Sequence, residues 1–256
     1  MSDSRLLGNR AKLVYHAEPR MKTRKVAPMG RKHIVRMRGD VRDHPRYSIS
    51  EAALYLRIPV STLMAWARGQ DYVTVGGIRK TFKPLIDLAG PEHKLLSFYN
   101  LAEAHVLRST TEGGVPLRNV RRALEYIREA IPGEHPLLSH AFEVSGKEVF
   151  ISHLGATVNA TRHGQIAMRK ILEEYLKRIE RDMAGMPIRV FPIHSKRTEI
   201  HPMFSSGKPV VRGKGIMISV LWGRKNTGES VTEIAKDYDL TQREVQEAIE
   251  DYEYAA

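Results

Sequence analysis

The sequence predicts a mainly α-helical protein with small β hairpins, in which a winged helix-turn-helix domain precedes a C-terminal helix-turn-helix domain of three helices. Two observations support this prediction. Pairs of short helices with capping signals occur near both ends of the chain, and a glycine turn between two strand-like runs follows the first pair. A length of 256 residues favours two or three compact units, and a hydrophobic fraction of 42% is sufficient for their cores.

Composition excludes several classes of protein. The chain has no cysteine, which excludes a disulfide scaffold, thiolate zinc sites and thiol catalysis. The first ten residues, MSDSRLLGNR, lack the apolar core of a signal peptide, and the longest apolar run, GIMISVLWG, is far too short to cross a bilayer. We therefore expect a soluble cytoplasmic protein with no membrane partner.

Basic residues are concentrated at the N-terminus. Residues 1–46 contain thirteen lysines and arginines against four acids, which accounts for +9 of the net charge of +12. With few apolar residues, this arm is expected to be flexible when free, and it is suited to lie along a phosphate backbone. A solubilising tail is an equally good interpretation of the same composition.

The first helix pair begins directly after this arm. Ser48, followed three residues later by Glu51, is a capping-box pattern that predicts a helix from Ile49. The residues RIP then end this helix. A second helix is predicted over residues 60–68, with Trp66 on its inward face.

A basic hairpin is predicted next, because YVTV and IRKTF flank a Gly-Gly turn. Two short helices followed by such a hairpin form a winged helix-turn-helix, in which the second helix enters the major groove and the wing contacts the DNA backbone. A helical hairpin used only for packing is the alternative. The side chains predicted to contact DNA here are Arg57, Ser61, Thr62, Arg68, Arg79, Lys80 and Lys83.

A second helix pair follows. Asn100 with Glu103 predicts one helix start, and Pro116 at a first-turn position predicts another. The outer face of the latter helix is basic, which suits phosphate contacts, although a solvated basic face is the commoner role of such a row. The arginines assigned to DNA on this face are Arg118, Arg121 and Arg122.

The remaining middle segment gives mixed signals. AFEVSGKEVFIS predicts a hairpin around Ser145-Gly146, and ATVNAT predicts a third strand. Residues 165–183 predict a long amphipathic helix for packing or dimerisation. We expect residues 47–183 to form one domain, 184–199 a linker, and 200–256 the terminal domain.

The terminal domain ends in two predicted helices, each of which begins with a capping box, Ser230 with Glu233 and Thr241 with Glu244. MISVLWGRKN predicts a short helix before them. Residues 229–256 contain nine acids against two bases, a net charge of −7. Such a helix pair would repel phosphate but attract a cationic protein.

Two stretches resemble known families. YSISEAALYLRIPVSTLMAW resembles the first helix-turn-helix of MerR-type regulators, which also continue with a wing and a second helix pair. Met64 stands where those regulators often present an arginine, so we expect DNA recognition through backbone and shape. About 55 residues around GESVTEIAKDYDLT closely resemble a small bacterial antitoxin domain of unknown function, although Lys214-Gly215 replaces its usual Thr-Arg. Together they resemble the longer VapB-type antitoxins, whose partners are PIN-domain ribonucleases.

This resemblance implies a type II antitoxin that neutralises a PIN-domain ribonuclease toxin encoded nearby and represses its own operator as a homodimer, without a cofactor. The basic arm and winged domain would hold DNA, and the acidic unit would hold the toxin or a second copy. The small family members are thought to touch DNA with this fold, which would reverse the assignment and leave Lys208, Arg212 and Lys214 to contact phosphate. The carboxylates assigned to the toxin or to dimerisation are Glu233, Asp237, Glu244, Glu247, Glu250 and Asp251.

Two other functions stay open. The first is a stand-alone MerR-like transcriptional regulator without a toxin partner, which the absence of a neighbouring nuclease gene would favour. The second is a scaffold or RNA-associated protein, which weak and equal binding to all sequences would favour.

No catalytic or metal site is predicted. GRKNTGES nearly matches a phosphate-binding loop, but Glu229 occupies the position of the essential lysine. The histidines lack metal-ligand spacing, and His135 and His140 are interpreted as polar loop residues. We therefore expect no enzyme.

Overall fold

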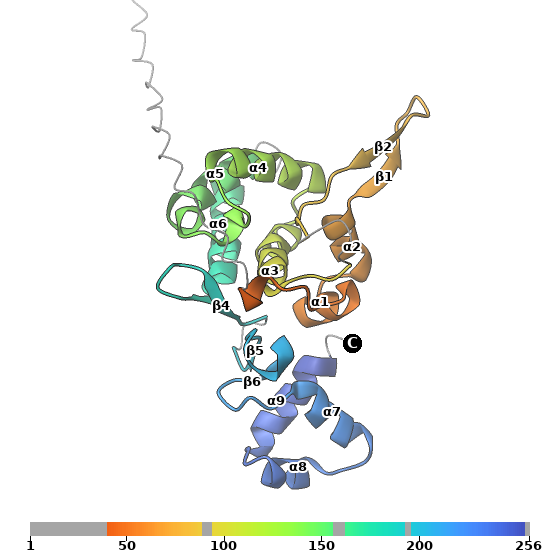
Figure 1. The fold of residues 1–256 in the computed structure, drawn as a ribbon, viewed down its shortest axis with the longest axis vertical. Coiled ribbons are helices and arrows are strands. Elements are labelled where there is room, and N and C mark those ends of the chain that lie inside the picture. Colours follow the sequence, from red (N-terminus) through yellow and green to blue (C-terminus); the bar gives the residue numbers. More distant parts are fainter. Residues whose placement is uncertain (1–39, 89–93, 156–161, 193–195, 254–256) are drawn as a thin grey trace, which may run out of the picture. The chain divides into compact units, whose positions relative to one another are not determined.

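A computed structural model of the chain describes residues 40–88, 94–155, 162–192 and 196–253. Helices dominate this part of the chain, and its strands pair as two-stranded antiparallel sheets, which confirms the predicted fold class (Figure 1). No helix within the described ranges is both long enough and apolar enough to cross a membrane. Most of the basic arm, residues 1–39, lies outside these ranges, as does the expected strand ATVNAT.

In chain order the helices are α1 (Ile49–Leu56), α2 (Val60–Arg68), α3 (Phe98–Glu112), α4 (Leu117–Ala130), α5 (Lys147–Gly155), α6 (Arg162–Leu176), α7 (Ile218–Asn226), α8 (Val231–Asp237) and α9 (Gln242–Glu253). The strands are β1 (Gln70–Val73), β2 (Arg79–Phe82), β3 (Ile179–Arg181), β4 (Pro187–Val190), β5 (Thr198–Glu199) and β6 (Val210–Val211). The short segments are η1 (Val41–Asp43), η2 (Pro136–Leu138), the π-helical η3 (Phe142–Gly146) and η4 (Ser205–Gly207).

Local capping chemistry sets the first helix pair, as predicted. The backbone N–H of Glu51 donates to Ser48 Oγ at 3.1 Å, and the Glu51 carboxylate accepts from the Ser48 N–H at 2.9 Å. α1 ends at Leu56, and the next residue, Arg57, has a left-handed φ of 54°. Because this conformation is unfavourable for a residue with a Cβ, the turn into α2 is strained at Arg57.

The hairpin predicted for residues 141–152 is wrong, because this segment is helical (η3 and α5). Phe142, Gly146 and Phe150 are four residues apart and all buried, a spacing that suits one helix face. A Cβ on Gly146 would lie 2.6 Å from Ile131 Cδ1. The glycine therefore permits close packing against Ile131 at the end of α4 instead of forming a turn.

The long helix predicted for residues 165–183 is also wrong at its C-terminal end. α6 stops at Leu176, and residues 179–190 form the β3–β4 hairpin. Asp182 makes the hairpin turn, since its carboxylate accepts from the N–H groups of Ala184 and Met186 at 3.0 and 2.9 Å. Met183, expected on the apolar helix face, is fully exposed in this turn.

Two further expectations change in detail. The start of α3 is capped by Ser97 with Asn100, not by Asn100 with Glu103, and Glu103 is buried. Strand β4 lies within the expected linker of residues 184–199. The division into domains itself stays a proposal.

Two clusters of buried side chains hold the described residues together. The larger one includes Leu63, Trp66, Leu101 and Phe142, and it joins α1–α6. The smaller one includes Leu221, Ile234 and other side chains of α7, α8 and α9.

Candidate DNA-binding and partner-binding surfaces

The outward face of α2 is small and weakly polar. Ser61 and Arg68 are exposed, Thr62 is half-buried, and Met64 is 41% exposed. Trp66 is buried, and its carbonyl oxygen accepts from the backbone N–H of Leu85 at 2.7 Å. The inward side therefore fixes the helix in the core, while the outward side leaves Arg68 as its long hydrogen-bond donor.

The β1–β2 hairpin, here called the wing, projects from the helices (Figure 1). Val73 pairs with Arg79 and Tyr72 with Lys80, so both cations lie on the second strand. The rings of Tyr72 and Phe82 stack with their centroids 4.1 Å apart. Arg79, Lys80 and Lys83 are all exposed, as a phosphate-contacting wing requires.

The three arginines assigned to DNA on α4 differ in their surroundings. Arg118 and Arg122 are exposed. The Arg121 guanidinium lies 4.8 Å from the centroid of the Phe82 ring and donates to the carbonyl oxygen of Lys83, and burial lowers its pKa. Arg121 thus fastens the base of the wing to α4.

Arg128, about two turns further along α4 than Arg121, supports the same connection. It donates to the carbonyl oxygen of Leu85 at 2.7 Å and pairs with Asp87 at 3.0 Å. The wing and the second helix pair are consequently joined by two arginines.

Two of the carboxylates assigned to a protein partner are helix caps. Glu233 accepts from the N–H of Ser230 at 3.0 Å, and Glu244 accepts from the N–H of Thr241 at 2.8 Å. Hydrogen bonds from Ser230 lower the pKa of Glu233, and those from Thr241 lower the pKa of Glu244. Both capping boxes predicted from the sequence are present.

Other carboxylates of this set pair within the chain. Asp237 pairs with Arg224 at 2.6 Å, and Glu247 pairs with Arg197 at 2.5 Å and with Arg243 at 2.8 Å. Glu250 is exposed on α9. The acidic surface that faces solvent is therefore smaller than the sequence charge implies.

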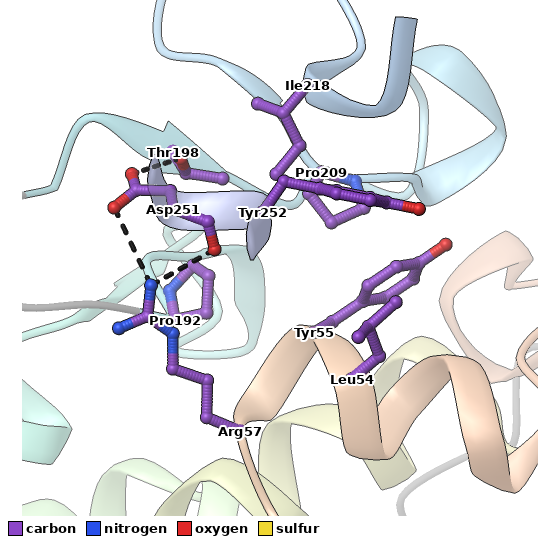
Figure 2. Close-up of a pocket in the computed structure, with 9 residues that line it drawn as sticks. All are labelled: Leu54, Tyr55, Arg57, Pro192, Thr198, Pro209, Ile218, Asp251 and Tyr252. Atoms are coloured by element: carbon purple, nitrogen blue, oxygen red, sulfur yellow. Dashed lines mark hydrogen bonds and ion pairs between the residues drawn. The ribbon is translucent and has the colours of Figure 1, made fainter. Parts of the chain in front are cut away.

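Asp251 and Arg57, assigned by sequence to different surfaces, contact each other (Figure 2). Asp251 Oδ1 lies 3.6 Å from Arg57 Nη2, which also donates to the Asp251 carbonyl oxygen at 3.1 Å. Thr198 Oγ1 donates to Asp251 Oδ2 at 2.8 Å. Burial raises the pKa of Asp251 despite these partners.

Tyr55 and Tyr252 line the small pocket beside this pair (Figure 2). Burial raises the pKa of Tyr55 to about 12, so its hydroxyl stays neutral at physiological pH. Nothing in the sequence signalled this joint, because Arg57 and Asp251 are 194 residues apart.

Two of the three cations considered for a reversed assignment also have contacts within the chain. The Arg212 guanidinium lies 4.9 Å from the centroid of the buried Phe191 ring, and Lys214 Nζ donates to the carbonyl oxygen of Asp239 at 3.2 Å. Lys208 is exposed.

A histidine and carboxylate cluster lies apart from these surfaces. His135 Nδ1 is 3.2 Å from Glu103, and its Nε2 is 3.5 Å from Asp43. Asp43, Glu134 and His135 each offer one ligand atom within 4.8 Å of the others, so these are the described residues best placed to hold a metal ion. Sequence reasoning interpreted His135 as a polar loop residue, but its side chain is only 8% exposed.

Comparison with known proteins agrees with this organisation. Residues 45–124 match a family described as "Putative DNA-binding HTH domain", and residues 199–252 match one described as "Protein of unknown function (DUF433)". A protein of Mycobacterium tuberculosis (strain ATCC 25618 / H37Rv), named "Putative antitoxin VapB45", is 28% identical over 226 residues, which cover 81% of this chain and 94% of that protein. The chain is similar to a VapB-type antitoxin.

The crystal structure of Rv2018 from Mycobacterium tuberculosis has the same fold. Its TM-score is 0.60 at 23% identity, over 80% of this chain and 98% of that chain. The predicted resemblance to a helix-turn-helix antitoxin is thus confirmed, and the two family matches fall on the winged and the terminal parts.

Proposed function

We propose that the chain is the antitoxin of a type II toxin-antitoxin pair. It binds and neutralises a PIN-domain ribonuclease encoded nearby, and it represses its own operator as a homodimer. The observation that carries this proposal is the similarity to an antitoxin over 226 residues, which cover 94% of that protein.

The DNA-binding part of the proposal rests on the winged helix-turn-helix. Arg68, Arg79 and Lys80 are exposed, and the wing base is held to α4 by Arg121. Arg118 and Arg122 add exposed positive charge on α4. The wing and the helices hold these cations in fixed positions, where they can neutralise phosphates of a DNA duplex.

The toxin-binding part rests on charge. Toxins that bind RNA tend to be basic around their sites, and the terminal unit has a net charge of −7 over residues 229–256. Asp237 and Glu250 are exposed on α8 and α9 and belong to this surface. The same surface also suits dimerisation, so a binding test must separate the two.

The experiment is co-expression with the product of the adjacent gene, followed by purification and a toxicity assay. We expect the two proteins to co-purify and growth to be restored. Glu250→Lys, combined with Asp237→Lys, should weaken capture of the toxin and leave retention on operator DNA intact. Arg79→Gln with Lys80→Gln should do the reverse.

Each alternative has its own outcome. An adjacent gene product that neither co-purifies nor is neutralised removes the antitoxin function, and retained binding to the chain's own promoter would then favour a stand-alone regulator. Weak and equal retention on every duplex would favour a scaffold or RNA-associated protein. Size-exclusion chromatography with light scattering shows whether the variant with Asp237→Lys and Glu250→Lys still forms a homodimer.

A further inference from the structure

The tip of the wing exposes aliphatic side chains. Val73 and Ile78 are 63% and 62% exposed, and Val75 is completely exposed. All three residues belong to the β1–β2 hairpin, which projects from the helices (Figure 1). Exposed aliphatic side chains that gather at a protruding tip mark a contact surface more often than exposed aliphatic side chains that are scattered over a surface.

The tip has a defined conformation. The N–H of Thr74 donates to the carbonyl oxygen of Ile78 at 2.9 Å, and the N–H of Gly77 donates to that of Thr74 at 2.8 Å. A Cβ added to Gly76 or Gly77 would meet no atom of the described residues within 4 Å, so the turn stands clear of the rest of that part of the chain. The Tyr72–Phe82 stack holds the base of the hairpin. The aliphatic side chains are therefore presented in a fixed arrangement.

Positive charge lies beside this apolar tip, on strand β2. Arg79 is the cross-strand partner of Val73, and Lys80 follows it in β2. Asp71, the acid of the hairpin, accepts from Thr81 Oγ1 at 2.5 Å in the strand part below the tip. An apolar tip with cations beside it on one strand suits a partner that has a dense negative surface beside an apolar interior, which describes a DNA duplex entered through its minor groove.

We propose that the wing inserts Val75 and Ile78 into the minor groove, where they wedge into a base step and bend the duplex, while Arg79 and Lys80 hold the flanking phosphates. This inference rests on the DNA binding proposed above and specifies its mode. Unstacking a step is offset by the apolar contact and by the closer approach of the cations. Bending also provides a sequence preference, because flexible base-pair steps bend most easily. Such a preference would suit a protein whose α2 carries Met64 in place of a base-reading arginine.

The test compares variants on two duplexes, the segment upstream of the chain's own reading frame and a random sequence of equal length. Val75→Ser with Ile78→Ser removes the wedge, and Arg79→Gln with Lys80→Gln removes the cations. Val144, which is 62% exposed on η3, supplies a matched control as Val144→Ser. Affinity is measured at several salt concentrations by fluorescence anisotropy, and bending is measured by energy transfer between dyes at the two ends of the duplex.

We expect the wedge variant to bind the upstream duplex about tenfold more weakly at every salt concentration, because apolar contacts release no counterions. The slope of log affinity against log salt should stay unchanged, and most of the bend should disappear. The cation variant should instead flatten that slope by about two. Val144→Ser should match the wild type in both measurements.

Three results would overturn the inference. If the wild type binds the upstream duplex but the wedge variant equals it in affinity and bend, the wedge is wrong while the proposed function stands. If the wild type binds neither duplex, both are wrong. A wedge variant that keeps its DNA affinity but loses self-association assigns the tip to a second copy and likewise overturns the proposal.

Discussion

At the scale of single residues, the largely buried side chain of His135 pairs with the carboxylates of Glu103 and Asp43. Burial disfavours its protonated form, but the hydrogen bond and charge of Glu103, with the charge of Asp43, outweigh burial and raise the pKa of His135. Tyr99, with its ring centroid 4.9 Å from that of the imidazole, packs against the same site. The cluster joins η1, at the end of the basic arm, to α3 and η2.

The raised pKa makes the stability of the fold depend on pH. Protonated His135 stabilises the folded state, so its contribution is complete below the ordinary pKa of 6.5 and is lost as pH rises through the higher folded pKa. We expect His135→Gln to lower the free energy of unfolding more at about pH 5.5 than at about pH 9. Urea denaturation across this range measures the difference. The exposed His140→Gln serves as control, and an equal loss at both ends of the range would disprove the assignment.

At the scale of elements, the sequence predicts best where the signal is local. The capping boxes at Ser48, Ser230 and Thr241 each involve residues three apart, and all three are present. The segment around Gly146 was predicted as a hairpin because its alternation is local too, whereas its helix depends on the contact with Ile131. Contacts distant in sequence leave no such pattern.

The same division applies to the candidate surfaces. The cations of the wing belong to a hairpin that its local strand and turn signals predict, and they are exposed on it. The partners of Arg121 and Asp251 were not, because each depends on how distant elements pack.

The cap of α9 offers a direct test at this scale. Thr241→Ala removes the side-chain oxygen that accepts from the Glu244 N–H at 3.1 Å, and we expect the free energy of unfolding to fall by about 1 kcal/mol. The matched control is Thr232→Ala, an exposed position within α8, where alanine favours the helix and should slightly raise stability. Chemical denaturation followed by circular dichroism gives both values. Equal effects of the two substitutions would show that the cap contributes nothing.

At the scale of the whole described chain, Arg57 and Asp251 connect the first helix pair to the terminal helix. We expect a double-mutant cycle with Arg57→Ala and Asp251→Ala to give a coupling energy of about 1–3 kcal/mol, since the pair is largely desolvated. Denaturation of the four proteins supplies the cycle. A cycle with Arg57→Ala and Glu250→Ala, which removes an exposed acid one position away, should give a coupling near zero.

The contact between Arg57 and Asp251 also offers a way to couple DNA binding to protein binding. One of its residues precedes the helix expected in a DNA groove, and the other lies on the helix expected to meet a protein. Suppose that a protein binds α9 and breaks the contact between Arg57 and Asp251, and that this changes the affinity for DNA by some factor. Binding of DNA must then change the affinity for that protein by the same factor. DNA and the bound protein would thereby change each other's affinity for the chain without direct contact.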